Sequence, residues 1–447
     1  MAKIYFNDAL RLAVQALRSP ALSSSPSPRI IRDVYGRVRY AVDCERAAYP
    51  SEALAVLEKA QVALGPYATS QEILFHDSFS DPRAVFGSPD WHRTIVSLGV
   101  DDDGQPLEEV VASVMDRQIT GQDWLRPSAA GNAHPHRLVF FGLKGGVGRS
   151  TALCMVAWGL ARKGKRVLLI DFDLESPGLS GLILPSSRVA EFGIVDWLVE
   201  DAVGQGDDVL NRMVSESSLG ETTTGAVRVA AAMGQSEQDY LAKLARAYAD
   251  VPGSNGPQRM GERMLRLVER LEGREKPDVV LIDSRAGLHD LAAVSITGLA
   301  DTALLFATDG AQTWSGYAQL FAHWRKRPDV ATRVRERLAL VRALTPKTGN
   351  REASIRQFKQ RAYELFAELY DEIPADVASV DPAEYFHPGE SDESAPHAPI
   401  LIDWDERFQE FDPGLRFEDG GASDAQIEAA FGGLIRWAAQ QAFEEVS

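Results

Sequence analysis

A glycine-rich loop between an apolar run and a helix-like segment is the feature that most constrains how this chain can fold. Residues 138–143 are almost entirely apolar, which is typical of a buried strand, and residues 150–162 are typical of a helix. The loop between them reads Lys-Gly-Gly-Val-Gly-Arg. Glycines let the backbone curl so that several N–H groups point at one anion, and the N-terminus of the next helix adds partial positive charge. This order of strand, loop and helix predicts a phosphate-binding loop.

Two later apolar runs end in carboxylates. The run at residues 166–172 contains Asp171 near its end and is followed directly by Asp173. The run at residues 278–283 ends at Asp283. Apolar strands separated by helices predict an α/β fold, a mostly parallel sheet with helices on both faces. Because ligands of such sheets bind at the carboxyl ends of the strands, we expect the loop and these carboxylates to lie close together.

The chain has 447 residues, which favours two or three units. We expect a small α+β domain of unknown role at residues 1–130, a linker at 131–136, and the α/β domain with an acidic C-terminal extension at 137–447. The expected helices of the first domain are 8–17, 51–64 and 107–117, and its expected strand is 36–43. The further strands expected in the α/β domain are 226–231, 302–307 and 338–344, and its further helices include 237–250, 258–271, 351–370 and 423–443.

Composition narrows the class of protein. No apolar run approaches the length of a membrane span, and the N-terminus lacks the apolar core of a signal peptide. The two cysteines, Cys44 and Cys154, are too few and too far apart for a disulfide framework. We therefore expect a cytoplasmic protein.

The net charge of −17 is unevenly spread along the chain. Residues 371–430 hold 17 acidic residues against two arginines, whereas residues 325–361 hold 12 basic residues against three acidic ones. The basic block leaves nucleic-acid binding open, and Arg333, Arg335 and Arg337 are the side chains whose neutralisation would test it. The competing interpretation is that both blocks are solvated faces, and it is the one we favour.

Three motifs in order carry a resemblance to a known family. Residues 144–151 (Lys-Gly-Gly-Val-Gly-Arg-Ser-Thr) resemble the deviant Walker A loop of the ParA/MinD class of P-loop NTPases. Residues 167–173 resemble the next strand and first switch of that class, and residues 280–287 resemble its Walker B strand and second switch. The resemblance covers residues 137–345 and, more faintly, 400–413. It does not reach residues 1–130.

The resemblance implies ATP with Mg²⁺ as the ligand, and it implies roles for individual residues. Those that would contact the nucleotide are Gly145, Gly146, Val147, Gly148, Arg149, Ser150, Thr151 and Gly287. Those that would hold Mg²⁺, directly or through water, are Ser150, Asp171 and Asp283. Asp173 would position the attacking water, and Lys144 would reach across a dimer interface to the partner's nucleotide. The loops after Ala307 and Leu344 are expected to contact the base, and these residues do not by themselves distinguish adenine from guanine.

Arg149 departs from the family pattern, which has Lys at this position. Arginine is longer, planar and bidentate, so the exchange is not conservative at a phosphate site. Two consequences stay open: Arg149 pairs with phosphates and hydrolysis is slow, or the domain binds nucleotide tightly without turnover. Because Ser150, Asp173 and Asp283 are all present, we favour slow hydrolysis.

The predicted function is a slowly hydrolysing ATPase that acts as a nucleotide-dependent dimerisation switch and controls an unidentified partner protein. One alternative is a non-hydrolysing ATP-binding scaffold in a multiprotein stress or phage-defence system, and another is a DNA-partition ATPase. Membrane docking is least favoured, because the helix expected at 423–443 has no basic face opposite its apolar one.

Overall fold

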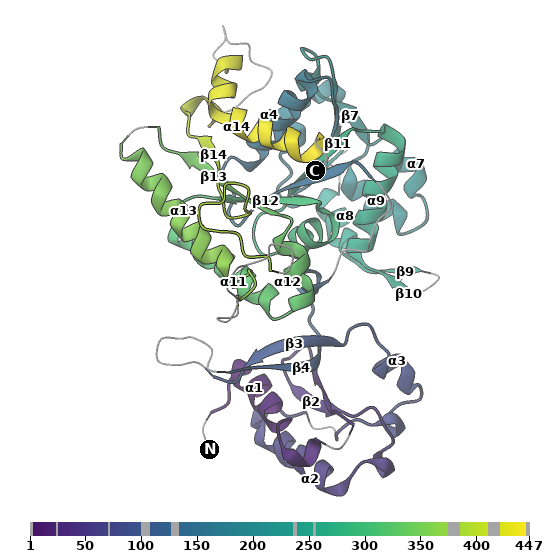
Figure 1. Cartoon of the computed structure of the whole chain (residues 1–447). Coiled ribbons are helices and arrows are strands. Elements are labelled where there is room, and N and C mark those ends of the chain that lie inside the picture. Colours follow the sequence, from purple (N-terminus) through teal and green to yellow (C-terminus); the bar gives the residue numbers. More distant parts are fainter. Residues whose placement is uncertain are drawn as a thin grey trace. The chain divides into compact units, whose positions relative to one another are not determined.

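A computed structural model of the chain describes residues 3–23, 26–69, 72–99, 108–126, 134–235, 239–253, 256–347, 349–373, 385–409 and 421–443. The chain divides into two compact units (Figure 1), the first formed by residues 1–122 with 322–331 and the second by 123–321 with 332–447. The predicted domain boundary at residue 130 and part of the predicted linker fall on residues 127–133, outside the described residues. Parts of the acidic extension, 374–384 and 410–420, also lie outside them.

The first unit contains a four-stranded mixed sheet with helices, which confirms the expected small α+β fold. Strand order is β2-β1-β4-β3, with β1 and β4 parallel and the other pairs antiparallel. The strands are β1 (Arg29–Arg32), β2 (Val38–Ala41), β3 (His92–Ser97) and β4 (Glu109–Asp116). The helices are α1 (Phe6–Ala16), α2 (Ser51–Ala63) and α3 (Pro82–Phe86).

The helix expected at residues 107–117 is wrong, because this segment forms strand β4. Its residues alternate in burial: Ala112 and Val114 are buried, whereas Val111 is 49% exposed. That period of two is the pattern of a half-buried strand, and the three valines of the segment stiffen the side chains in a way that suits a pleated sheet. Strands β1 and β3 were not predicted either.

The second unit is built on an eight-stranded sheet of order β14-β13-β12-β5-β11-β6-β8-β7 among the described residues. All neighbouring pairs are parallel except β7 with β8. The strands are β5 (His136–Gly142), β6 (Arg166–Phe172), β7 (Val214–Glu216), β8 (Ala226–Ala230), β11 (Val279–Ser284), β12 (Thr302–Ala307), β13 (Leu338–Thr345) and β14 (Ile400–Asp403). A separate short hairpin pairs β9 (Val251–Gly253) with β10 (Gly256–Gln258). The mostly parallel α/β sheet predicted from the sequence is confirmed.

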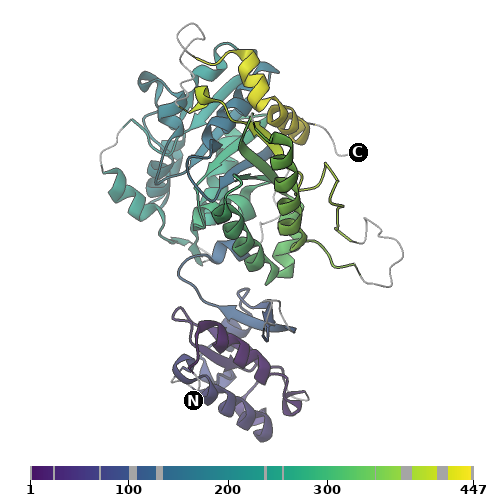
Figure 2. The same cartoon turned by 90° about the vertical axis from the view of Figure 1, so that its left-hand side faces the viewer.

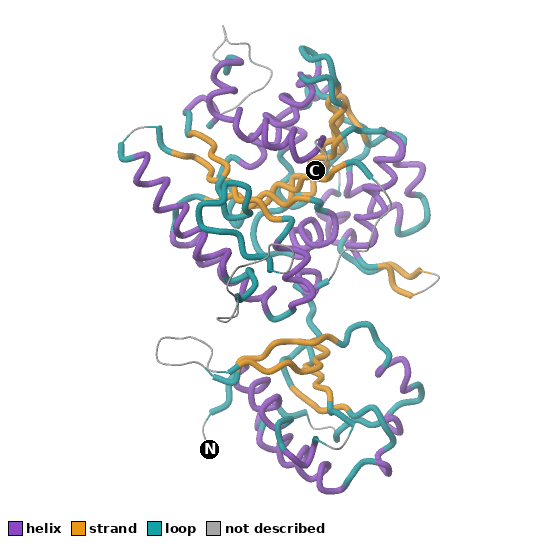
Figure 3. Tube along the Cα trace, in the orientation of Figure 1, coloured by secondary structure: helices purple, strands orange, loops and turns teal. Residues whose placement is uncertain are grey.

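Helices cover both faces of this sheet, with α4 and α14 on one face and α11 and α13 on the other (Figures 1 and 3). The helices are α4 (Arg149–Arg162), α5 (Leu179–Ile183), α6 (Ile194–Asp201), α7 (Gly206–Leu210), α8 (Tyr240–Ala247), α9 (Met260–Glu275), α10 (Asp290–Ala293), α11 (Ala311–Arg325), α12 (Pro328–Arg335), α13 (Arg351–Ala367) and α14 (Asp424–Phe443). A π-helical segment, Val294–Leu299, follows α10.

The terminal helix α14 packs its apolar face into the core of the second unit, as the sequence predicts. Phe431, Leu434 and Ile435 are buried in the same hydrophobic cluster as residues of α4 and the central strands. The two helices lie side by side (Figures 1 and 2), and a Cβ on Gly159 of α4 would meet Ile435 Cγ2 at 2.5 Å. The close approach of α4 and α14 at this point therefore requires glycine, which has no side chain, at position 159.

Strand register brings the predicted carboxylates to one place. In the parallel pairing of β11 with its two neighbours, Asp283 lies opposite Asp171 of β6 and opposite Phe140 of β5. Strand β5 ends two residues later at Gly142, where the glycine-rich loop begins. The loop and both strand-end carboxylates therefore share the carboxyl edge of the sheet, the edge at which parallel α/β sheets bind ligands.

Candidate functional site

The loop after β5 has the backbone that a phosphate cradle needs. Gly146 and Gly148 adopt left-handed φ values of +74° and +77°, which L side chains rarely tolerate. Gly148 is also the N-cap of α4, so the helix begins directly at Arg149. Lys144, Gly145 and Gly146 are exposed, whereas Val147 is buried and anchors the loop to the core. The loop thus presents backbone N–H groups and a helix N-terminus at the sheet edge.

Arg149 does not extend into solvent but bridges two carboxylates. Its Nε donates to Asp283 Oδ1 at 2.6 Å, and its Nη2 donates to Asp173 Oδ2 at 2.9 Å. Ser150 Oγ donates to the other oxygen of Asp283 at 2.6 Å. The structure therefore brings together four of the predicted site residues, and it places the Arg149 guanidinium on the carboxylates where the sequence prediction had it on phosphates.

Asp171 is the most deeply enclosed of the three carboxylates, with no exposed surface. It accepts two backbone hydrogen bonds, from Asp173 N at 3.1 Å and from Leu179 N at 3.2 Å, and these shape the turn after β6. Desolvation by burial, followed by the negative charge of Asp283, raises the pKa of Asp171 to about 8. Asp171 thus holds a proton that an exposed aspartate would lose.

The cluster carries more negative than positive charge. Burial raises the pKa of Asp283, and the neighbouring Arg149 charge and the Ser150 hydrogen bond offset part of that rise. Burial by itself would lower the pKa of Arg149, but the charges of Asp283 and Asp173 outweigh it, so this pKa is raised and the guanidinium stays charged. Arg149 is 8% exposed, and its Nη1 is buried with no hydrogen-bond partner among the described residues.

The remaining predicted residues lie around this cluster. The Gly287 amide donates to Gly142 O at 3.0 Å, so it is engaged with the backbone rather than free for a phosphate. Gly287 has a left-handed φ of +86°. Thr151 is half-buried in the first turn of α4. Lys144 makes no hydrogen bond or ion pair with another residue that the structure describes, which leaves its ammonium group available.

The donor set of the cluster fits Mg²⁺ in part. Hydroxyl and carboxylate oxygens are the hard ligands this ion prefers, and Ser150 and Asp283 supply both kinds in contact with each other. No group of three or more His, Cys, Asp or Glu residues in the described ranges is arranged to hold a metal by itself. Sites for Mg²⁺ with nucleotide commonly use only one or two protein ligands and complete the shell with phosphate and water, so the set suits a metal that arrives with a phosphate ligand.

The unpartnered Nη1 of Arg149 and the glycine loop point to that phosphate. A buried N–H donor without a partner is unfavourable, and an anion at the helix N-terminus would supply acceptors. Residues 136–328 match the sequence model of a family described as "AAA domain". This segment is an AAA domain of the P-loop class. It has homologues among MinD proteins: the chain is 41% identical over 69 residues to the septum site-determining protein MinD of Escherichia coli (strain K12), and 35% identical over 71 residues to that of Buchnera aphidicola.

The matched stretches are short. The Escherichia coli match covers 15% of this chain and 23% of the relative, so the chain spans less than a quarter of the length of these curated relatives. Solved structures similar to the chain include a ParA family ATPase from Chlorobium tepidum TLS, with 14% identity, a TM-score of 0.42, and coverage of 68% of this chain and 98% of that one. Another is a MinD cell division protein from Aquifex aeolicus, with 16% identity, a TM-score of 0.38, and coverage of 70% and 99%.

The AAA domain ties its two strand-end segments together with contacts that the sequence analysis missed. Glu175, four residues beyond Asp171, contacts the guanidinium of Arg285, two residues beyond Asp283. His289 Nε2 lies 3.6 Å from the same carboxylate. Tyr240 of α8 donates to Leu174 O at 2.6 Å. Opposite charges after two strand ends at similar distances were the signal that could have revealed the Glu175–Arg285 pair.

The loops predicted to contact a base lie beyond β12 and β13 in the AAA domain and its continuation. Asp309 accepts from Trp314 Nε1 at 3.0 Å and pairs with Arg361 at 2.8 Å. At the end of β13, Leu344 has a left-handed φ of +53° and a 40% exposed side chain. Its Cδ2 would lie 4.0 Å from a Cβ on Gly148, so this apolar side chain borders the phosphate loop.

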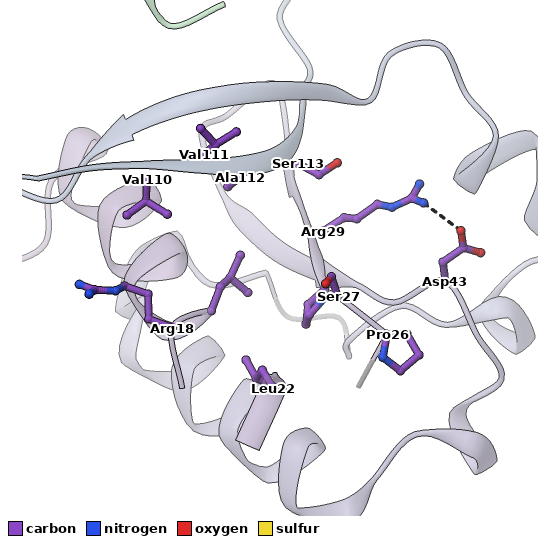
Figure 4. A pocket seen from close by; sticks show the side chains of 12 residues that line it. Arg18, Leu22, Pro26, Ser27, Arg29, Asp43, Val110, Val111, Ala112 and Ser113 are labelled. Atoms are coloured by element: carbon purple, nitrogen blue, oxygen red, sulfur yellow. Dashed lines mark hydrogen bonds and ion pairs between the residues drawn. The ribbon is translucent and has the colours of Figure 1, made fainter. Parts of the chain in front are cut away.

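Outside the AAA domain, the first unit contains a cavity of about 430 Å³ between the end of α1 and strands β1 and β4 (Figure 4). Leu22, Val110 and Ala112 are among its lining residues. Its charged groups are paired: Arg29 Nη2 donates to Asp43 Oδ2 at 2.9 Å, as the dashed line in Figure 4 marks. This lining gives no basis for assigning chemistry to the cavity. Among the described residues, no helix is both long and apolar enough to cross a membrane.

Proposed function

We propose that this chain binds ATP with Mg²⁺ at the carboxyl edge of the eight-stranded sheet, hydrolyses it slowly, and uses the nucleotide to switch between monomer and homodimer. The observation that carries the proposal is the contact of Ser150, the second residue of the helix after the glycine loop, with Asp283 at the end of a neighbouring strand. A hydroxyl at a phosphate loop beside a strand-end carboxylate is the arrangement by which P-loop enzymes hold Mg²⁺. The resemblance of the three motifs to the ParA/MinD class is what suggests a dimerising switch that acts on a partner protein.

In this proposal the chain's residues have separate tasks. The residues that contact the nucleotide are Gly145, Gly146, Val147, Gly148, Arg149, Ser150, Thr151 and Gly287. Ser150, Asp171 and Asp283 hold the metal directly or through water, and the metal, when bound, neutralises charge on the transferred phosphate. Asp173 orients the attacking water once Arg149 has left it. Lys144, whose ammonium group is exposed, serves the nucleotide of a second copy.

The Gly287 amide supplies the switching element of the proposal. It now donates to Gly142 O, the last residue of β5. Contact with a terminal phosphate would require this bond to break, and Gly287 can change its backbone without a side-chain clash. Presence or loss of the terminal phosphate would therefore shift the segment after β11 between two arrangements, which is how nucleotide state is passed to a partner surface.

Binding of DNA through the basic block is disfavoured, because many of its side chains are engaged within the protein. Arg335 is 7% exposed and donates twice to Asp371, at 2.6 and 2.8 Å. Lys347 pairs with Asp405, and Arg351 pairs with Asp403, each at 2.7 Å. A partition protein would present such charges to phosphates. A non-hydrolysing scaffold is the stronger alternative, because Arg149 occupies Asp173, the residue proposed to position water.

Phosphate release decides between hydrolysis and the scaffold. Purified protein with Mg-ATP should release inorganic phosphate slowly, and Asp173→Ala should abolish the release. Asp278→Asn is the matched control, because Asp278 lies just before β11, at the edge of the sheet away from the loop, where it accepts a hydrogen bond from Arg166 N at 2.7 Å. Tight ATP binding without release in the wild type establishes the scaffold instead, and unchanged release in Asp173→Ala removes the assignment of Asp173.

Mass in solution decides on the switch. Light scattering with ADP, ATP and a non-hydrolysable ATP analogue should show a dimer with the triphosphates and a monomer with ADP. Lys144→Ala should bind the analogue yet stay monomeric. A mass that does not respond to nucleotide contradicts the switch while leaving nucleotide binding intact.

A further inference from the structure

Arg149 divides its guanidinium between carboxylates from two different strands. Nε and Nη2 serve Asp283 and Asp173 at 2.6 and 2.9 Å, and the side chain of Asp283 is only 3% exposed. With Ser150 on its second oxygen, Asp283 has both oxygens engaged. Any cation that uses the Arg149-bound oxygen of Asp283 must therefore displace the guanidinium first.

Departure of Arg149 without a replacement would leave a cluster of buried carboxylates with no counter-ion. Asp173 and Asp283, the two carboxylates that Arg149 pairs with, are 9% and 2% exposed. Uncompensated buried charge is strongly unfavourable, more so than a broken surface ion pair. The guanidinium is therefore held in place until another cation takes over its role.

Arg149 also has a reason to move when an anion arrives. Its side chain is more than nine-tenths buried, and the Nη1 atom has no hydrogen-bond partner among the described residues. Arg149 is the first residue of α4, directly after the glycine turn, so its side chain starts at the helix N-terminus that faces the loop. A phosphate there would offer acceptors for the whole planar fork.

We infer that Arg149 is the resident counter-ion of the Asp173–Asp283 carboxylates, exchanged for a divalent cation when the triphosphate draws the guanidinium onto its oxygens. This inference rests on the proposed nucleotide site. It predicts that metal and nucleotide each bind weakly alone and strongly together, because each removes the obstacle to the other. A lysine could not divide two nitrogens between the two carboxylates in this way, so the coupling is a consequence of having arginine at this position.

The test measures metal binding to nucleotide-free protein, with Mn²⁺ as the probe and electron paramagnetic resonance as the readout. Wild type should bind Mn²⁺ weakly, and Arg149→Met should bind it at least about tenfold more tightly, because the carboxylates are then free. Arg162→Met is the matched control from the same helix, since Arg162 is half exposed and pairs with Asp424, and it should bind Mn²⁺ like the wild type. Equal Mn²⁺ affinity in wild type and Arg149→Met overturns the inference.

If circular dichroism shows that Arg149→Met does not fold, a second variant tests the inference in its place. Arg149→Met with Asp173→Asn removes one charge of each sign and keeps Asp283 and Ser150, so it should also bind Mn²⁺ more tightly than the wild type. Wild type carries a further test: its affinity for a non-hydrolysable ATP analogue should fall by about 100-fold when EDTA replaces Mg²⁺. A fall of less than a few-fold overturns the inference. Failure of the analogue to bind at all, with the Mn²⁺ difference present, removes the proposed nucleotide and leaves the counter-ion role.

Discussion

Strand β5 has a buried arginine–carboxylate cluster at each of its ends, and the two differ in balance. At the amino end, Arg137 donates through Nε and Nη2 to the two oxygens of Glu272, each at 2.7 Å. One guanidinium meets one carboxylate in the bidentate geometry that satisfies both. At the carboxyl end, Arg149 serves two carboxylates from different strands, a third lies beside them, and one of its nitrogens has no partner among the described residues.

The difference separates a structural pair from a site. A bidentate pair such as Arg137 with Glu272 offers little to an added cation, because both carboxylate oxygens already accept from the guanidinium. The cluster around Arg149 has both an excess of carboxylate oxygens and an unused donor, so a cation and an anion can each be accommodated. Unequal charge at the carboxyl edge, and not burial by itself, is the observation on which we base the proposal of a ligand site at that end of the strand.

Breaking the balanced pair should have the largest effect on stability. Arg137→Met leaves Glu272 buried and unpaired, so the free energy of unfolding should fall by about 3–5 kcal/mol, measured by urea denaturation. Added Mg²⁺ should not restore it, whereas Mg²⁺ should restore part of the stability lost in Arg149→Met. The double change Arg137→Met with Glu272→Met should recover most of the loss. Equal rescue of both arginine variants by Mg²⁺ contradicts the distinction between the two ends.

The pH dependence of stability should come from the unbalanced end. Burial raises the pKa of Asp171 from 3.8 to about 8, so between these values the folded protein holds a proton that the unfolded chain has lost. This contribution to stability is complete below about pH 4 and is lost as the pH rises through 8. In EDTA, the free energy of unfolding should fall by roughly 3–4 kcal/mol between pH 5 and pH 8 from this group.

Asp171→Asn removes the titrating group and should flatten that slope. The slope is the quantity to compare, because an amide nitrogen cannot accept the second of the two backbone hydrogen bonds that Asp171 receives, from Asp173 N and Leu179 N. Glu272→Gln at the opposite end serves as the control and should keep the slope. An unchanged slope in Asp171→Asn would assign the pH dependence to another group.

The two ends also differ in how much of them the sequence could predict. Convergence of Asp171, Asp173 and Asp283 on the glycine loop was predictable, because parallel strands end at one edge whatever their exact register. The pairing of Arg149 with Asp283 and Asp173 could not be predicted. It depends on the register of the strands, which places Asp283 directly opposite Asp171. The Arg137–Glu272 pair joins a strand to a helix 135 residues away, and nothing in the local pattern of either segment indicates it.

The same reasoning explains where the fold was predicted well. Apolar runs such as β5, β6 and β11 are buried on both faces, so composition by itself identifies them. Strand β4 is buried on one face only, and its partly apolar pattern predicts a helix where the structure has a strand. One-sided strands give a weaker signal, because the exposed face of a strand and the polar face of a helix have similar compositions.

The smallest effect should come from the rim of the unbalanced end, where Glu175 contacts Arg285. Both side chains are 28% exposed, so Glu175→Gln should lower the free energy of unfolding by about 1 kcal/mol or less. Because the pair joins the segments after β6 and β11, its loss should raise amide hydrogen exchange in residues 174–179 more than elsewhere. The segment at the amino end, around Arg137, should exchange as in the wild type. Uniform exchange across both ends would mean that the pair does not hold the two segments together, and that the Arg149 bridge is sufficient to do so.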